Sequence, residues 1–455
     1  MTINTELETI FRAGLAKVDP FQMILDCMRL EKDRLVVRID EDEAQIDLIR
    51  FNAVYLLGVG KAAGRMAQAV EQILGERLDG GLISTKTGHG APLKKIRQIE
   101  AGHPVPDENS LRAGQEMNAL AENFDERTLV INVISGGGSA LLEALPSFED
   151  QGQRKQITLG DLRRTTQVLM ACGATINEIN CIRKHLSLLK GGQFIRRIQP
   201  AQSINLILSD VVGDRLDTIA SGLTCGDPTT FQDALDIIRR YRIEDAMPGP
   251  VMRYLELGMK GEVSETPKPG DPVFNSTRNL LIGTNARALA GAAEKAGQLS
   301  YHTAILTSQL TGEARLAAGF LLGIARDIRQ RNLLISRPAC VIAGGETTVT
   351  IHGSGLGGRN QEMALACLAD MEKDPQACEG IYFLAASTDG SDGPTDATGA
   401  FASVEQLELA QGLPATIEEY LQNNDSYHFF EQTGGLLKTG PTQTNVCDVQ
   451  IMIIR

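Results

Sequence analysis

The feature that most constrains the fold of this chain is a repeated unit, a short apolar run that ends in glycine and is followed by a helix-length amphipathic segment. The run AVYLLGVG at residues 53–60 leads into KAAGRMAQAVEQILGERL, and NLLIGTN at residues 279–285 leads into ARALAGAAEKAG. Runs this apolar are typical of parallel strands that are buried on both faces. Their alternation with helices predicts an α/β fold with right-handed crossovers and mostly parallel sheets.

The length of the chain, 455 residues, suits two domains better than one. Residues 258–275, GMKGEVSETPKPGDPVFN, are rich in proline, glycine and charge and predict a linker. We therefore expect two Rossmann-like α/β domains, at residues 1–265 and 266–455. Ligands of open α/β sheets bind beyond the carboxyl ends of the strands, and candidate anion sites and acidic loops follow such strands in both halves of the chain. We therefore expect the active site in the cleft between the domains.

The composition argues against several classes of partner. A net charge of −13, 4% aromatic residues and no tryptophan argue against binding to nucleic acid or to anionic membranes. The eight cysteines form no CxxC pair, which favours buried, reduced thiols in a cytoplasmic protein. The N-terminal segment lacks the pattern of a signal peptide, and no apolar run is long enough to span a membrane. A homodimer is left open.

The segment VINVISGGGSALLEALP, residues 130–146, has three glycines directly after an apolar run. Gly136, Gly137 and Gly138 can take positive φ angles and let a ligand approach the main chain. Consecutive N–H groups in such a turn form a concave site for an anion, and a helix that begins near Ser139 adds its dipole. Together with Ser135, these residues predict a site for a carboxylate or phosphate. The alternative is a tight turn without a ligand.

Two cations lie in similar positions at predicted strand or helix ends. Lys61 follows Gly60 in LLGVGKAAGRMA, a segment that matches neither the P-loop nor the GxGxxG pattern. In GGETTVTIHGSGLGGRNQEMALA, residues 344–366, we expect a hairpin and then a helix with Arg359 at its start. Arginine is unfavourable there unless an anion lies near, so both cations are candidates to bind phosphate or carboxylate. The alternatives are a solvated lysine and a salt bridge from Arg359 to Glu346 or Glu362.

Aspartates gather in two glycine-rich loops after predicted strands. ASTDGSDGPTDATGA contains Asp389, and LSDVVGDRLDTIASG contains Asp210 and Asp214. Their spacing is not that of an EF-hand, but Mg²⁺ needs only one or two carboxylates when substrate phosphates supply the other ligands. The alternative is that they act in turns and helix caps. Anion sites and acidic loops in the two halves of the chain are what phosphoryl transfer requires.

Nine motifs of the chain, taken together and in order, resemble the MOFRL-type glycerate 2-kinases. They are GVGKAA, GHPVPD, ISGGGSALL, RKHLS…KGGQ, SDVVGD…IASG, GGETTV, GGRNQE, STDGSDGPTDATGA and GPTQTNV, and the resemblance runs from about residue 5 to the C-terminus. The chain departs from the pattern at SGLTCGDPTT, where Leu223 replaces a proline. The resemblance implies a glycerate kinase domain at residues 1–265 and a MOFRL domain at residues 266–455.

The resemblance also implies an activity, the ATP-dependent phosphorylation of D-glycerate, usually to 2-phosphoglycerate, with Mg²⁺. Lys61 and Arg359 match residues that are regarded as important in this family. Two alternatives are an NADP-dependent hydroxypyruvate reductase and a non-catalytic phosphosugar or nucleotide sensor. The residues that we expect to be catalytic are Lys61, Arg359 and Asp210. Those that we expect to bind substrate or phosphate are Ser135, Gly136, Gly137, Gly138, Ser139, His103, Asn285, Glu346 and Asn360, and the expected metal ligands are Asp389 and Asp214.

Overall fold

The computed structural model describes residues 2–455, which divide into two compact units. Unit 1 contains the residues up to Met23, Ser209–Gly213 and Gly283–Arg455, and unit 2 contains Ile24–Leu208 and Asp214–Ile282. The chain therefore passes between the units several times, and the predicted linker at residues 258–275 lies inside unit 2. Each unit contains more than one segment of the chain, whereas two continuous domains, residues 1–265 and 266–455, were expected. The predicted cleft between two domains stays a prediction.

Unit 2 is built on a six-stranded sheet with the order β11-β10-β7-β4-β5-β6. The four pairs from β10 to β6 are parallel, so the predicted parallel α/β sheet is confirmed here. The central strand β7 is buried along its whole length, as its continuous apolar run predicts. Its strands are β4 (Ala53–Val59), β5 (Gly80–Lys86), β6 (Ile96–Ala101), β7 (Thr128–Ile134), β10 (Gln202–Leu208) and β11 (Thr277–Gly283), and the helices among them include α3 (Ala63–Leu74), α4 (Glu108–Ala121), α5 (Gly138–Leu141) and α8 (Gln193–Ile198).

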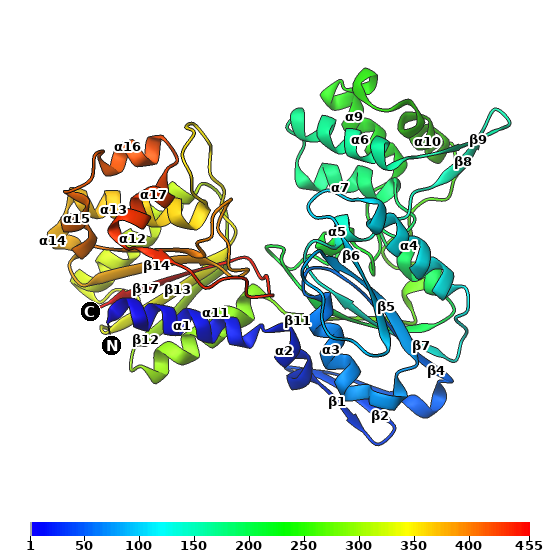
Figure 1. Ribbon diagram of the computed structural model, residues 1–455, viewed down its shortest axis with the longest axis horizontal. Coiled ribbons are helices and arrows are strands. Elements are labelled where there is room, and N and C mark those ends of the chain that lie inside the picture. The colour runs from blue at the N-terminus through cyan, green and yellow to red at the C-terminus, as the bar shows by residue number, and fades with distance from the viewer. Residues whose placement is uncertain (1) are drawn as a thin grey trace. The chain divides into compact units, whose positions relative to one another are not determined.

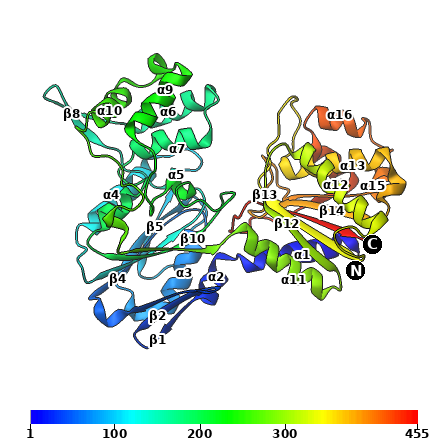
Figure 2. The same cartoon turned by 180° about the vertical axis from the view of Figure 1, so that it is seen from behind.

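Four helices of unit 2 form a second core of their own beyond one end of the sheet (Figures 1 and 2). They are α6 (Leu159–Ala171), α7 (Ile176–His185), α9 (Phe231–Tyr241) and α10 (Gly249–Met259). Three of them begin at capping boxes, Thr158 with Asp161, Thr175 with Glu178 and Thr230 with Asp233, which satisfy N–H groups that a helix start leaves unpaired. The hairpin of β8 (Ser147–Asp150) and β9 (Gln153–Gln156) extends from this end.

The six-stranded sheet of unit 1 has the order β12-β13-β17-β14-β15-β16, and here the prediction of a mostly parallel sheet is wrong. Of its five strand pairs in the described chain, one is parallel and four are antiparallel. The C-terminal strand β17 makes two of the antiparallel pairs, because it inserts between β13 and β14 and runs opposite to both. β15 makes the other two, with β14 and β16. The strands are β12 (His302–Leu310), β13 (Ala339–Gly345), β14 (Ile381–Ser387), β15 (Gly399–Ser403), β16 (Leu436–Leu437) and β17 (Asp448–Ile454).

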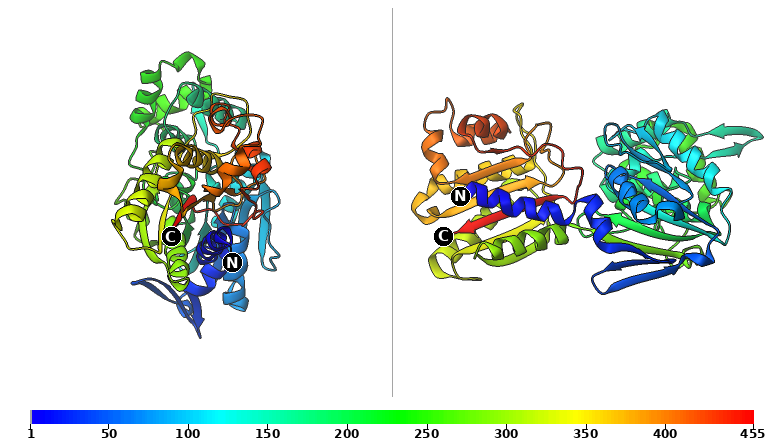
Figure 3. Two further views of the ribbon diagram at one scale, coloured as in Figure 1. Left: turned by 90° about the vertical axis from the view of Figure 1, so that its left-hand side faces the viewer. Right: turned by 60° about the horizontal axis from the view of Figure 1, so that its bottom comes forward.

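Helices cover both faces of the unit 1 sheet. On β17, Ile451 and Ile453 face the core under α1 (Ile3–Lys17) and α11 (Asn285–Gln298), whereas Met452 and Ile454 face α12 (Ala314–Arg331) and α13 (Arg359–Lys373). The two-residue period of a strand produces this division, and each fully buried aliphatic side chain contributes roughly 2 kcal/mol. Figure 3 shows α1 beside β17, so the two ends of the sequence share one core.

Other regions differ from the sequence predictions or add to them. Residues 346–358 form no hairpin and contain one isolated bridge, from Thr348 to Glu313, but α13 begins at Arg359 as predicted. A small antiparallel sheet of β1 (Met28–Glu31), β2 (Arg34–Ile39) and β3 (Asp42–Asp47) was not predicted. Six of the eight cysteines are buried and two are half-buried, in agreement with the predicted thiols. Within residues 2–455, no helix combines the length and the hydropathy of a membrane span.

Candidate functional site

In unit 2, the loop that carries Lys61 and the triple-glycine turn lie side by side because their strands are neighbours. β4 and β7 pair in parallel with Val59 opposite Ile134, so both loops leave the same edge of the sheet. Lys61 N donates to the carbonyl oxygen of Gly136 at 2.9 Å, and Ala62 N donates to Ser135 Oγ at 3.0 Å. Two hydrogen bonds therefore hold the lysine loop against the glycine turn.

The main chain of the glycine turn presents unpaired donors. Gly137 has a φ of 83°, which glycine adopts without strain, and it precedes the single-turn helix α5. The N–H groups of Gly136, Gly137, Gly138 and Ser139 have no acceptor among the described residues. Four consecutive N–H groups without an acceptor are the arrangement that an anion site requires, and the binding of an anion here stays a prediction. We call these four residues the amide nest.

Lys61 and His103 lie next to the amide nest. A Cβ built on Gly137 would lie 2.9 Å from His103 Cδ2 and 3.4 Å from Lys61 Cγ, so both side chains contact this glycine. Neither the Lys61 ammonium nor the His103 ring has a hydrogen-bond or ion-pair partner within residues 2–455. Burial, with the charges of Lys61 and Lys86, lowers the pKa of His103 to about 4. The imidazole is therefore neutral at pH 7, and its unprotonated ring nitrogen can accept a hydrogen bond.

The two predicted serines differ in their surroundings. Ser135 is fully buried, and its hydroxyl accepts the N–H of Ala62. Its side chain therefore stabilises the loop and is not exposed to a ligand. Ser139 Oγ lies 2.7 Å from Ser221 Oγ, which donates to Asn180 Oδ1 at 3.2 Å. Ser139 also lines a cavity, so its hydroxyl is held in position at a ligand-sized space.

That cavity has a volume of about 490 Å³ and lies wholly within unit 2. Its walls combine apolar side chains with a few polar groups, as small-molecule sites commonly do. The polar part includes His103, Ser139, Glu143, Arg183 and Lys190, and Gly137 brings the amide nest to the same wall.

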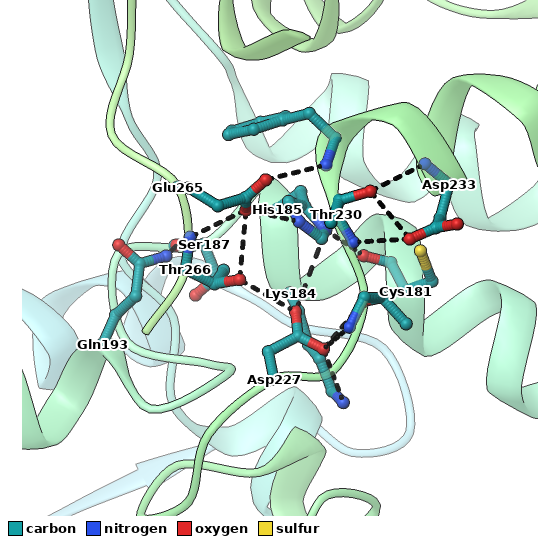
Figure 4. Close-up of polar contacts among 12 residues, drawn as sticks. Cys181, Lys184, His185, Ser187, Gln193, Asp227, Thr230, Asp233, Glu265 and Thr266 are labelled. Carbon is teal, nitrogen blue, oxygen red and sulfur yellow. Dashed lines mark hydrogen bonds and ion pairs between the residues drawn. The ribbon is translucent and has the colours of Figure 1, made fainter. Parts of the chain in front are cut away.

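The segment after Arg183 belongs to a buried ionic network (Figure 4). Lys184 Nζ donates to Asp227 Oδ1 at 3.3 Å, and His185 Nε2 lies 2.9 Å from Glu265 Oε1. Burial alone would lower the pKa of His185, but its bonds to Cys181 and Glu265 and the charge of Asp227 raise that pKa to about 9. The cation in turn helps to lower the pKa of Glu265 to about 2, although burial opposes this. This network joins α7 to the loops at residues 227 and 265.

In unit 1, the predicted residues gather where β13 and β14 end and β17 begins. Asp448 lies between Gly345 and Ser387 in the sheet register and is fully buried. Arg359 donates to both carboxylate oxygens of Asp448, at 2.5 and 2.9 Å, and its Nη1 lies 2.7 Å from Glu346. The salt bridge from Arg359 to Glu346, one of the alternatives, is therefore present. Glu362 pairs with Arg315 instead.

The aspartates of the loop at residues 388–398 have structural partners. Asp392 is buried and accepts the N–H groups of Asn360 and Gln361, so it caps α13, and burial raises its pKa to about 6. Asp389 is half-buried and accepts from Ser387 Oγ and Ser391 N, both at 3.0 Å. Asp396 pairs with Lys438. The predicted turn and cap roles are thus present. Of Asp389 and Asp392, only Asp389 is partly exposed to solvent.

Other predicted residues are held inside unit 1. Asn285 Nδ2 donates to the carbonyl oxygens of Val446 and Asp448, at 2.7 and 2.9 Å, and Asn360 Nδ2 donates to Asp392. The carbonyl oxygen of Asp210 accepts the thiol of Cys447 at 3.2 Å. These contacts bring Asn285, Asn360 and Asp210 to the end of the sheet where Asp448 lies.

The two predicted metal ligands belong to different units, Asp389 to unit 1 and Asp214 to unit 2. The described chain holds no group of three or more histidine, cysteine or acidic side chains arranged for a metal ion. The roles predicted for Asp389 and Asp214 stay predictions.

Comparison with known proteins decides the family. Residues 6–256 match the family model described as a domain of unknown function, DUF4147, and residues 339–448 match the MOFRL family. A glycerate 2-kinase from Pyrococcus horikoshii is 40% identical over 97% of this chain and 95% of its own length. The chain belongs to the MOFRL-type glycerate 2-kinase family.

Two further relatives of this MOFRL-type chain were found. The crystal structure of a glycerate kinase from Thermotoga maritima is 34% identical, with a TM-score of 0.84 over 100% of this chain and 99% of its own. A protein from Agrobacterium vitis, provisionally named a hydroxypyruvate reductase, is 38% identical over 88% of this chain and 86% of its own length. The structural likeness agrees with the α/β fold found here.

Sequence reasoning missed several charged residues at the two sites. Arg183 and Lys190 stand in the motif RKHLS…KGGQ, which was noted for its resemblance but not for its charges. Glu143 follows the glycine turn in an apolar segment, and Asp448 opens the C-terminal strand, in which most of the other residues are apolar. For Glu143, Lys190 and Asp448, a charged residue next to or inside an apolar run was the available signal, because such a residue is buried only with a partner.

Proposed function

We propose that this protein is a D-glycerate kinase that transfers a phosphoryl group from ATP to a hydroxyl group of D-glycerate, with 2-phosphoglycerate as the product. The observation that carries this proposal is the meeting of four unpaired main-chain N–H groups with the unpaired cation of Lys61 and a neutral His103. Phosphoryl transfer needs positioning and neutralisation of negative charge more than it needs covalent chemistry. Free donors and a free cation at one point are suited to that task.

In this proposal the amide nest binds the oxygens of the phosphoryl group, and Lys61 neutralises charge that develops during transfer. The N–H groups are fixed by the turn, so they need no reorganisation at the moment of reaction. His103, which is neutral at pH 7, accepts a hydrogen bond from the substrate hydroxyl, and Ser139 adds a hydroxyl at the cavity wall. All of these groups come from unit 2.

For Arg359 we propose a role that depends on exchange of partners. Its three donor atoms on the guanidinium are occupied by Asp448 and Glu346 in the structure. Burial raises the pKa of Glu346. A phosphate that displaced the side chain of Glu346 would leave the Asp448 pair intact and would gain the Nη1 donor. Asn285 and Asn360 would then hold the surrounding main chain in place.

ATP and Mg²⁺ are the proposed co-substrates. Asp389 or Asp210 would contribute a carboxylate to the ion, and the nucleotide phosphates and water would supply the remaining oxygen ligands. The half-buried position of Asp389 and its oxygen-rich surroundings, with Ser387 and Ser391, fit a hard cation. When bound, the ion would neutralise charge on the nucleotide phosphates.

The test is phosphorus NMR of the product made from ATP, Mg²⁺ and D-glycerate. We expect one new phosphomonoester signal that co-resonates with added 2-phosphoglycerate. A signal that matches 3-phosphoglycerate would change the position of transfer. The absence of any phosphoglycerate, together with oxidation of NADPH on addition of hydroxypyruvate, would overturn the proposal in favour of the reductase.

A further inference from the structure

The strongest unexplained group in the molecule is Arg183, which lies on α7 at the wall of the unit 2 cavity. Arg183 is half-buried at this wall, and burial lowers the pKa of its guanidinium, which the charge of Glu143 partly offsets. Among residues 2–455, it has no hydrogen-bond or ion-pair partner. A guanidinium has five N–H donors, and no described residue accepts from any of them, so all five are available to a ligand in the cavity.

The acidic neighbour of Arg183 is already committed elsewhere. Glu143 is 1% exposed, forms an ion pair with the equally buried Lys190, and accepts Ser187 Oγ at 2.6 Å and the N–H of Ala144 at 3.1 Å. One negative charge therefore faces two positive charges, Lys190 and Arg183. Arg163, which donates to the carbonyl oxygen of Pro106, adds a third cation to the cavity lining. This excess of positive charge favours the binding of an anion.

The shape of the Arg183 guanidinium and the charge of the two candidate ligands favour a carboxylate over a phosphoryl group at this position. The guanidinium is planar and pairs through two parallel N–H donors with a planar carboxylate. The phosphoryl group carries more charge, and the amide nest and Lys61 offer it donors on the same side of unit 2. D-glycerate has one carboxylate, and His103, Gly137, Ser139 and Arg183 line the same cavity.

We propose that Arg183 binds the carboxylate of D-glycerate in the unit 2 cavity and that the Glu143–Lys190 pair holds this wall in place. This inference rests on the proposed function, because it assigns the carboxylate site for that substrate. It makes Arg183 a binding residue that distinguishes glycerate from an uncharged polyol or amide. It also separates the roles of the cations, with Arg183 for the carboxylate and Lys61 for the phosphoryl group.

The experiment compares Arg183→Gln with the wild-type full chain in steady-state kinetics and in calorimetric titration with D-glycerate. We expect the KM and the Kd for D-glycerate to rise by about 100-fold, since a buried charge on the substrate loses its partner. The KM for ATP should stay within about 2-fold. Wild type should prefer glycerate to glyceramide strongly, and Arg183→Gln should lose most of that preference.

The matched control is Arg164→Gln, which removes an equal charge from an exposed position on α6 outside the cavity lining and should leave all constants unchanged. If Arg183→Gln does not fold, Arg183→Lys keeps the charge and should raise the glycerate KM by about 10-fold. An unchanged glycerate KM, or a rise in the ATP KM instead, would overturn the inference. A wild-type protein that phosphorylates no glycerate but still binds it through Arg183 would overturn only the proposed function.

Discussion

The polar clusters of the two units differ in whether their hydrogen-bonding groups have partners within the protein. In unit 2, the amide nest, Lys61, His103 and Arg183 have no partners in the described chain. In unit 1, Arg359 is bonded to Asp448 and Glu346, and Asn360 is bonded to Asp392. Unpaired buried groups cost free energy that a ligand recovers, whereas a paired cluster stabilises its own fold. Unit 2 thus presents donors that an anion could use directly, whereas the cluster of unit 1 is already paired, and Arg359 would have to release Glu346 before it could bind a phosphate.

The largest expected effect is on Lys61. We expect Lys61→Ala to lower kcat by about 1,000-fold, because the cation acts on charge that develops in the transition state. The midpoint of urea unfolding should change little, since the ammonium has no partner to lose. Steady-state kinetics and urea titration measure the two quantities. Lys94→Ala, at an exposed position, is the control, and a near-normal kcat in Lys61→Ala would remove Lys61 from the reaction.

Asp448 should show the reverse behaviour, with an effect on stability. Asp448→Asn takes a charged partner from Arg359 in a buried pair, and we expect a loss of about 3 kcal/mol in the free energy of unfolding. Chemical denaturation followed by circular dichroism measures it. Asp396→Asn breaks only the exposed pair with Lys438 and should cost less than about 1 kcal/mol. Equal losses of unfolding free energy in the two variants would show that the buried pair of Arg359 and Asp448 stabilises unit 1 no more than an exposed ion pair does.

Lys61 and Asp448 also differ in how far their surroundings could be predicted from the sequence. Lys61 and the glycines follow neighbouring parallel strands, so local runs and glycine patterns were sufficient to predict the nest. The position of β17 depends on pairing between segments far apart in sequence, and the run DVQIMII is apolar in either orientation. The mixed sheet and the role of Asp448 were therefore beyond a local pattern. Arg183 was quoted within a motif, but its lack of a partner is a property of three-dimensional packing.

His185 provides a pH-dependent test of the network in unit 2. Its pKa is raised to about 9 in the folded protein, from about 6.5 in an unfolded chain. A raised pKa stabilises the fold fully below pH 6.5, and this contribution is lost as the pH rises through 9. We expect His185→Gln to be less stable than wild type by about 3 kcal/mol at pH 6. The gap should narrow toward pH 10 in urea titrations, and a gap that is constant with pH would contradict a buried imidazolium.

His103 should show the smallest effect, with the opposite sign. Its pKa is lowered to about 4, so the unfolded chain takes up its proton first, and wild-type stability should fall as the pH drops from 6.5 toward 4. His103→Gln should show a shallower dependence over this range, measured by thermal unfolding at a series of pH values. The same slope in both proteins would mean that the ring titrates normally and is not the neutral acceptor proposed here.

The most direct test of the central claim is an NMR titration of protein labelled with ¹⁵N-glycine by 2-phosphoglycerate, with Gly136, Gly137 and Gly138 assigned from single variants. The account predicts that the amide resonances of these three glycines shift to lower field and saturate together with the other resonances that report binding. Saturation of binding with all three resonances unmoved would contradict an amide nest that holds the phosphoryl group.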